Sequence, residues 1–75
     1  MQSLSDNNAR ILRLPQVKAA TGLSRSTIYA KVKAGEFPRY IALGVRSVGW
    51  LESEIQEWID ERVKASRKLA GGTHA

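Results

Sequence analysis

The side chains best suited to specific chemistry gather in the segment TGLSRSTIYAKV, residues 21–32. Gly22 can take the left-handed conformation that ends a helix. Ser24, two residues later, is a preferred N-cap, because its hydroxyl can accept a hydrogen bond from a free backbone N–H of a new helix. A short glycine turn between two helices is typical of the helix-turn-helix motif, whose second helix reads base edges in the major groove of DNA.

The predicted second helix has an apolar face and a polar face. Ile28 and Val32 are four residues apart, so both point toward a core and leave a basic, polar face opposite. The candidate DNA-binding residues of this segment are Ser24, Arg25, Ser26, Thr27, Tyr29, Lys31 and Lys33. We expect Arg25 and Ser26 to lie nearest the bases and the later residues nearest phosphate groups. The alternative for the whole segment is an ordinary helical hairpin with a solvated face. For Lys31 alone, the alternative is a side chain that extends along the edge of the core.

The charges of the chain are unevenly distributed. The chain has 75 residues and a net charge of +5. Residues 1–50 contain eight Lys and Arg against two acids, whereas residues 51–75 contain four against five. The eight cations are Arg10, Arg13, Lys18, Arg25, Lys31, Lys33, Arg39 and Arg46. A basic half that brackets the motif is the electrostatic footprint expected for a polyanion such as double-stranded DNA, although a basic surface that serves only solubility is the alternative.

Several classes of function are excluded by what the sequence lacks. Without cysteine there is neither a disulfide framework nor a thiolate metal site. The short chain offers no plausible set of nucleophile, base and orienting group, and His74 stands alone, so we predict no enzyme activity, catalytic residue, metal or cofactor. No apolar run spans a membrane and the first residues do not resemble a signal peptide, which favours a cytoplasmic location.

The motif belongs to one small predicted domain. Residues 1–9 and 69–75 are predicted to be flexible tails, and residues 10–68 to be the DNA-binding domain. The domain begins with a short strand or lead-in that packs Ile11 inward. A first helix over residues 15–20 follows, since proline suits the first helical turn. Its predicted core positions are Leu14, Val17 and Ala20.

A hairpin is predicted after the second helix. Pro38 prevents that helix from continuing. Residues 39–50 alternate in polarity about Gly44, which is typical of two antiparallel strands joined by a turn. Beside a helix-turn-helix, such a hairpin is a wing. Arg46 near its tip and Arg39 at its base are further candidate DNA-binding residues, placed to meet the backbone or a minor groove, although charges on edge strands also serve solubility.

The last predicted element is a helix over residues 51–68. Its apolar positions recur at helical spacing, at Leu51, Ile55, Trp58, Ile59 and Val63. Acids near its start and bases near its end complement the helix dipole, so they need no role in DNA binding. Trp50 and Trp58 could stack on single-stranded bases, but their positions favour the core. The predicted fold class is therefore mainly α with a small β-hairpin wing, a winged helix-turn-helix.

Four short segments follow one another in this chain: TGLSRSTIY, FPR, LG and VGWLESEIQEWI. In this order they resemble the AlpA-type prophage regulatory proteins, relatives of phage excisionases and of MerR-like winged-helix domains. The resemblance covers roughly residues 10–65. It implies a sequence-specific double-stranded DNA-binding transcriptional regulator of a prophage or integrated element, acting on an integrase gene or a neighbouring gene. It also implies a bacterial protein that lies at the nucleoid when DNA is bound.

Two other functions stay open at this point. The first is an excisionase-like architectural factor that bends attachment-site DNA, with an integrase or further copies of itself as partners on adjacent sites. The second is a protein-interaction module that docks through its C-terminal helix. Cooperative occupancy with DNA bending would favour the first, and capture of a partner without DNA would favour the second.

Overall fold

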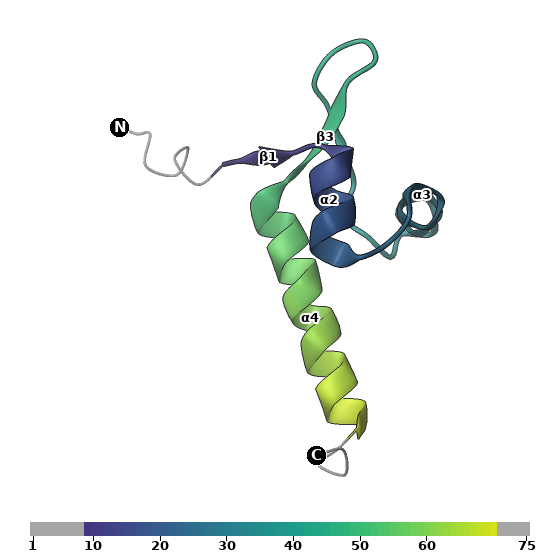
Figure 1. Ribbon diagram of the computed structural model, residues 1–75, viewed down its shortest axis with the longest axis vertical. Helices are drawn as coiled ribbons and strands as arrows, with labels where there is room; N and C mark the ends of the chain where they lie inside the picture. The colour runs from purple at the N-terminus through teal and green to yellow at the C-terminus, as the bar shows by residue number, and fades with distance from the viewer. Residues whose placement is uncertain (1–8, 71–75) are drawn as a thin grey trace.

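The computed structural model describes residues 9–70. Its elements in chain order are β1 (Ile11–Leu12), α2 (Leu14–Thr21), α3 (Arg25–Ala34), β2 (Ile41–Ala42), β3 (Val48–Leu51) and α4 (Glu52–Ala70). Figure 1 shows α2 and α3 beside the small sheet, with the loop between β2 and β3 standing above them and α4 running below. This confirms the predicted fold class, mainly α with a β-hairpin wing in a winged helix-turn-helix arrangement.

The turn between α2 and α3 has the predicted chemistry. Gly22 has a φ of 77°, in the left-handed region, and its N–H donates to the carbonyl of Lys18 at 2.7 Å. Ser24 caps α3, because its hydroxyl accepts a hydrogen bond from the backbone N–H of Thr27 at 3.2 Å. Gly35, with a φ of 78°, ends α3 in the same way as Gly22 ends α2. Helix α2 therefore ends within one residue of its predicted end, and α3 begins directly after its predicted N-cap.

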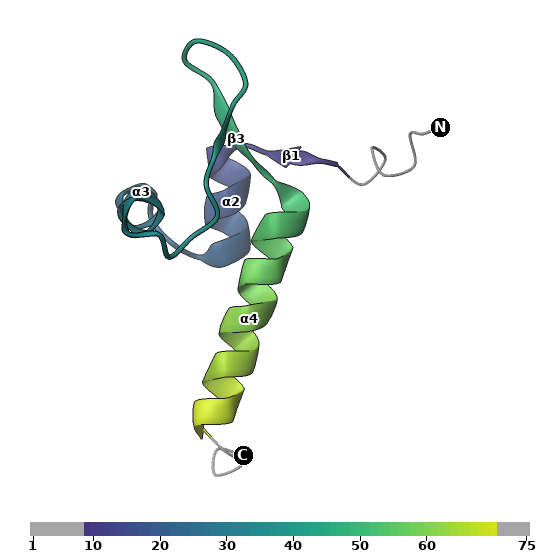
Figure 2. The same cartoon turned by 180° about the vertical axis from the view of Figure 1, so that it is seen from behind.

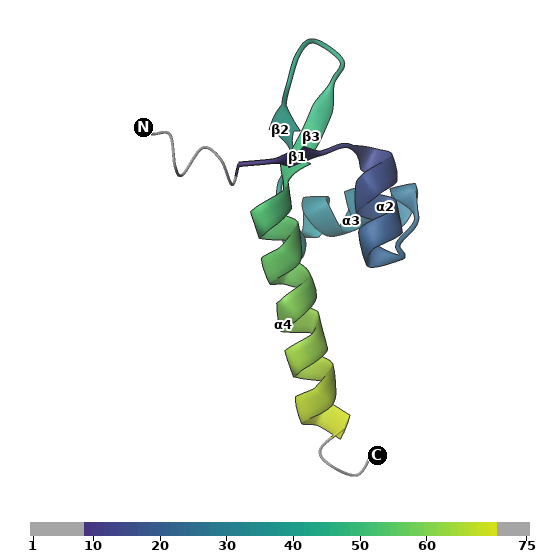
Figure 3. The ribbon, with the colours of Figure 1, turned by 60° about the vertical axis from the view of Figure 1, so that its left-hand side comes forward.

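The sheet has three antiparallel strands in the order β1-β3-β2, so β3 lies in the middle. Gly49 lies opposite Ile41 at the centre of β3. A Cβ at position 49 would overlap Cγ2 of Ile11 and lie only 3.1 Å from the carbonyl oxygen of Leu12. The close approach of β1 thus depends on a glycine. Figure 3 shows the three strands meeting above the first turn of α4.

A small core joins β1, α2, α3, β3 and α4, whereas both residues of β2 are exposed. Its buried members are Leu12, Val17, Ile28, Phe37, Trp50 and Ile55. The expectation that Ile11 packs inward is wrong: Ile11 is exposed and Leu12 is buried, because Leu12 is the residue opposite Trp50 across the sheet. Ala20, another predicted core position, is also exposed.

Helix α4 covers the core only with its first half. Ile55 is buried and Trp58 and Ile59 pack partly against the core. Val63, predicted to continue the apolar stripe, is 39% exposed. Figure 2 shows the cause: the helix continues downward past α2 and α3, beyond anything it could pack against.

The predicted tails lie almost entirely outside the described residues, and so does His74. The helix α4 extends to Ala70, two residues past the predicted end of the domain. Within residues 9–70, no helix is both long and apolar enough to cross a membrane. In the same part of the chain, His, Cys, Asp and Glu side chains form no group of three that could hold a metal ion.

Candidate nucleic-acid interface

On the side of α3 that faces the wing, a cation and three aromatic rings form a cluster, to which α3 contributes Arg25 and Tyr29. The guanidinium carbon of Arg25 lies 5.1 Å from the ring centre of Tyr29. The Tyr29 ring meets Tyr40 edge to face at 5.9 Å and Trp50 at 6.2 Å, and those two rings meet each other at 5.9 Å. Trp50 is fixed in turn, since its indole N–H donates to the carbonyl of Pro38 at 3.0 Å. The exposed Arg25 is thereby connected to the buried centre of the domain.

Packing in this cluster leaves Tyr29 half-buried, whereas the sequence predicted Tyr29 on the outward face of the helix. Lys33 and Arg39 line the hollow beside it, together with the rings of Tyr29 and Tyr40. An anionic group in that hollow would meet two cations and two phenol rings. Arg39 also borders a second hollow, whose other wall is formed by acidic residues of α4.

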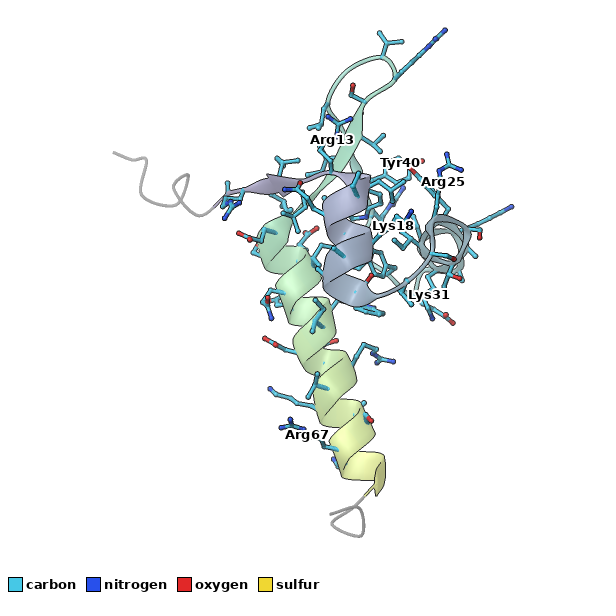
Figure 4. The ribbon with its side chains drawn as sticks, in the orientation of Figure 1. Arg13, Lys18, Arg25, Lys31, Tyr40 and Arg67 are labelled. Atoms are coloured by element: carbon cyan, nitrogen blue, oxygen red, sulfur yellow. The ribbon has the colours of Figure 1, made fainter. Side chains whose placement is uncertain are left out.

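The other predicted residues of α3 lie on a different side of the helix. Ser26, Thr27 and Lys31 line a shallow hollow with Glu36. The ammonium group of Lys31 lies 4.0 Å from a carboxylate oxygen of Glu36, and only 34% of the Lys31 side chain is exposed. Figure 4 shows Arg25 and Tyr40 on the wing side of α3 and Lys31 on the opposite side. The structure therefore separates Lys31 from Arg25, although the sequence placed both on one contact face.

The hydroxyl groups at the start of α3 are already engaged. Ser24 Oγ accepts a hydrogen bond from the Thr27 N–H and donates one to Thr27 Oγ1 at 2.9 Å. Ser26 Oγ lies 3.5 Å from Ser24 Oγ. The side chains of Ser24 and Thr27 thus already form hydrogen bonds within the helix cap. Ser26 and Arg25 remain the exposed polar side chains of the first helical turn.

The wing holds Arg46 as predicted. The loop between β2 and β3 is closed by the N–H of Leu43, which donates to the carbonyl of Ser47 at 2.7 Å. Arg46 and its neighbour Val45 lie in that loop and are exposed, Val45 to 99%. The tip of the wing thus presents one cation and one apolar side chain to solvent.

Sequence reasoning counted Arg13 only among the cations of the basic half, and it did not single out Tyr40. Arg13 is exposed, and its Nε donates to the carbonyl of Val48 at 2.9 Å, so the guanidinium lies at the base of the wing (Figure 4). Arg13 and Val48 are 35 positions apart, so no local pattern could pair them. The sequence offered one indication that Tyr40 lies near the proposed interface: it is an aromatic residue next to Arg39, in the segment that leads into the hairpin.

The two tryptophans belong to the fold, as their sequence positions favoured. Trp50 is completely buried. Trp58 is half-buried, its indole N–H donates to the carbonyl of Glu36 at 2.9 Å, and its ring meets Phe37 at 4.8 Å. Neither ring lies free as a platform for single-stranded bases. The indole of Trp58 also fastens the segment after α3 onto α4.

Comparison with known proteins agrees with the winged helix-turn-helix. The family model described as "Prophage CP4-57 regulatory protein (AlpA)" matches residues 10–63. The DNA-binding transcriptional activator AlpA of Escherichia coli K12 is 48% identical over 61 residues, which cover 73% of this chain and 87% of that protein. An uncharacterized protein of Enterobacteria phage P4, ORF88, is 49% identical over 59 residues, which cover 79% of this chain and 66% of the phage protein. The chain belongs to the AlpA family of prophage regulatory proteins, a family of regulators and not of enzymes.

Proposed function

We propose that this protein is a sequence-specific double-stranded DNA-binding transcriptional regulator of a prophage or integrated element, acting in the cytoplasm on an integrase gene or a neighbouring gene. The observation that carries the proposal is the Ser24-capped helix α3, with exposed Arg25 beside a wing that presents Arg46. The name of the Escherichia coli relative, a DNA-binding transcriptional activator, supports it.

In the proposed complex, the first turn of α3 enters the major groove. Arg25 and Ser26 contact base edges, because a guanidinium can donate two hydrogen bonds to guanine and a hydroxyl can pair with several bases. Lys33, Tyr29 and Thr27 contact phosphate groups and so fix the register of the helix. Lys31 contributes less, since its ammonium group is beside Glu36.

The wing supplies the second part of the interface. Arg46 at the tip and Arg39 before β2 approach the DNA backbone or a minor groove next to the recognition helix. Arg13 is added to the sequence-based set, because its hydrogen bond to Val48 holds an exposed cation at the base of the wing. A single recognition helix and one wing give a small contact area, which favours occupancy of adjacent sites by more than one copy.

Selection of bound duplexes from a random pool at physiological salt tests this proposal, because it requires no assumed operator. Enrichment of one short motif would support a specific regulator, and its occurrences could then be sought beside integrase genes. Retention of DNA without any enriched motif would count against specific regulation. Failure to retain DNA at all would reject the proposal and favour the protein-interaction module.

The affinity should fall steeply with salt. If about five cations neutralise phosphates, the logarithm of the binding constant should fall against the logarithm of the salt concentration with a slope of about −4 to −5. Lys33→Gln should make that slope shallower by about 0.9. Fluorescence anisotropy of a labelled duplex across a salt series measures both. Arg62→Gln is the control, because Arg62 lies over Trp58 on α4 and away from the wing. A slope near zero would contradict the electrostatic interface.

A second candidate function is supported by the tip of the wing. Val45 is 99% exposed beside Arg46, and an apolar side chain at a wing tip gains by burial against a base step. Apolar wedges next to an arginine in a minor groove kink DNA by roughly 20–90°. An excisionase-like factor that bends attachment-site DNA would use such a tip.

Bending should depend on Val45. With the selected motif placed between two fluorophores, we expect energy transfer to rise on binding, and to rise less with Val45→Ser while the salt slope stays unchanged. Val63→Ser, an exposed valine on α4, is the matched control. No bend with the unaltered protein would remove the architectural candidate. A bend that Val45→Ser leaves intact would assign the bending to another part of the interface.

A further inference from the structure

Helix α4 carries a charge pattern that the proposed DNA interface does not use. Five charged side chains recur along it at alternating spacings of three and four residues: Glu54, Glu57, Glu61, Lys64 and Lys68. Side chains at this spacing lie along one face of a helix. We call these five residues the charged stripe. Its first three members are acidic and its last two are basic.

The charged stripe is exposed and poorly compensated within its own helix. All five side chains are exposed, and none of them forms an ion pair within residues 9–70. Glu57 and Glu61 are four residues apart, as are Lys64 and Lys68, and like charges at that spacing destabilise a helix. One neighbouring pair, Glu61 and Lys64, has opposite signs. Arg39 borders the same hollow as Glu54, Glu57 and Glu61 but forms an ion pair with none of them within the described residues. The stripe can therefore still accept charges of opposite sign from a partner.

The half of α4 that carries the basic residues projects from the domain. From Asp60 to Lys68 every residue is exposed except Ala65, which is half-buried. Figures 1 and 3 show this part of the helix extending away from the sheet and beyond α2 and α3. A short helical segment without tertiary contacts is only marginally stable in water. A second helix packed along it would add the contacts that it lacks.

We propose that α4 pairs in antiparallel orientation with α4 of a second copy of this chain, through the charged stripe. With the two-fold axis between positions 62 and 63, Glu57 lies opposite Lys68 and Glu61 lies opposite Lys64. The symmetry repeats both pairs, so every one of these four side chains meets an opposite charge. A parallel pairing would instead set each residue against itself, with Glu against Glu and Lys against Lys. The order of charges along the stripe thus selects a second copy as its partner, in one orientation.

Exposed ion pairs determine how strong this pairing is, and its two-fold symmetry determines how the DNA sites are arranged. Exposed ion pairs each contribute little, so free copies in physiological salt are mainly monomers. Pairing takes effect when DNA holds two copies close together, since their local concentration is then high. A two-fold symmetric contact requires binding sites in inverted repeat. This DNA-linked part of the inference rests on the proposed function, whereas the pairing of the helices does not.

Reversal of charge on each half of the stripe tests the pairing. One double variant, Glu57→Lys with Glu61→Lys, makes the stripe basic from position 57 onward. The other, Lys64→Glu with Lys68→Glu, makes it wholly acidic. A quadruple variant with all four changes reverses the order of the charges while it keeps the net charge of the chain. Two quantities are measured: sedimentation at low salt without DNA, and occupancy of a single site and of an inverted repeat of the selected motif.

Each double variant alone should sediment as a monomer and bind the inverted repeat without cooperativity, whereas the unaltered protein should show cooperativity on the order of tenfold. The quadruple variant should regain both properties, because its stripe is again self-complementary. An equimolar mixture of the two double variants should also regain them, since basic then meets acidic at every pair. The affinity for a single site should change by less than about twofold in every case.

Three results would overturn the inference. Unchanged association in both double variants would show that the stripe does not form the contact. If the double variants lost association and cooperativity, and neither the quadruple variant nor the mixture regained them, charge complementarity would not be the cause of the pairing. The double variant Lys64→Glu with Lys68→Glu could also bind a single site more weakly. If that weaker binding accounted for its whole loss of affinity for the inverted repeat, the two lysines would contact DNA and not a second copy. If no form binds DNA, the proposed function fails, and sedimentation at low salt still decides the pairing.

Discussion

Replacement of Arg25 by alanine is expected to weaken binding to the selected motif by about 1–3 kcal/mol, roughly five- to 150-fold, and to leave binding to unrelated duplex nearly unchanged. The reason is that a base contact carries specificity, whereas contacts to phosphate carry most of the affinity for any sequence. Arg25 is exposed in the first turn of α3, where a recognition helix contacts bases.

The surroundings of Arg25 add to the expected effect. The Tyr29 ring lies 5.1 Å from the guanidinium and is itself held by Tyr40 and Trp50. A cation over an aromatic ring has fewer orientations to lose when DNA binds, so part of the ordering cost is met in the free protein. Tyr29→Leu should therefore weaken specific binding as well, and Tyr29→Phe, which keeps the ring, should weaken it less.

Competition experiments measure the effect of Arg25 directly. A labelled specific duplex is titrated in the presence of unlabelled specific or random duplex, at one fixed salt concentration. Arg25→Lys is the control, because it keeps the charge and loses the two-pronged donor geometry. It should retain the affinity for random duplex and lose most of the specificity. If Arg25→Ala lowered the affinity for both duplexes equally, Arg25 would be a phosphate contact and its assignment to a base would be wrong.

The helix-turn-helix could be predicted from the sequence because its signals are local. Gly22 and Ser24 determine where α2 ends and α3 begins through their own backbone and side chain, and the structure has both in those roles. The spacing of Ile28 and Val32 gave the core face of α3 for the same reason. The hairpin followed from alternation about Gly44. Each of these inferences needed no more than a dozen consecutive residues.

The parts that could not be predicted depend on residues far apart in the chain. Whether Ile11 or Leu12 faces the core is decided by the register with β3, in which Leu12 lies opposite Trp50. Two residues of alternating pattern are too few to choose between the faces. Tyr29 looked outward on a helical projection, yet its ring packs against Trp50, which is 21 positions later. Which residues of α3 lie on the side that faces the wing could therefore be identified only in three dimensions.

Trp50 links these distant parts, so its truncation should have the largest effect on stability. The side chain is completely buried, its indole N–H donates to Pro38, and its ring meets Tyr29 and Tyr40. Trp50→Ala should lower the free energy of unfolding by about 3–5 kcal/mol, from the lost apolar contacts and the cavity. The carbonyl of Pro38 would also lose its partner, which adds to the cost where water cannot replace the donor.

That loss is large for a domain of this size. At about 0.05–0.15 kcal/mol per residue, a chain of 75 residues has a free energy of unfolding of about 4–11 kcal/mol. Urea denaturation followed by circular dichroism should place Trp50→Ala at a much lower midpoint than the unaltered protein, or unfolded without urea. Tyr40→Ala is the control: Tyr40 touches the same ring but is 44% exposed, and should cost about 1 kcal/mol or less. Equal midpoints for the two variants would mean that the aromatic cluster does not hold the wing and α3 together. Arg25 would then lack the rigid support on which its specificity is argued to depend.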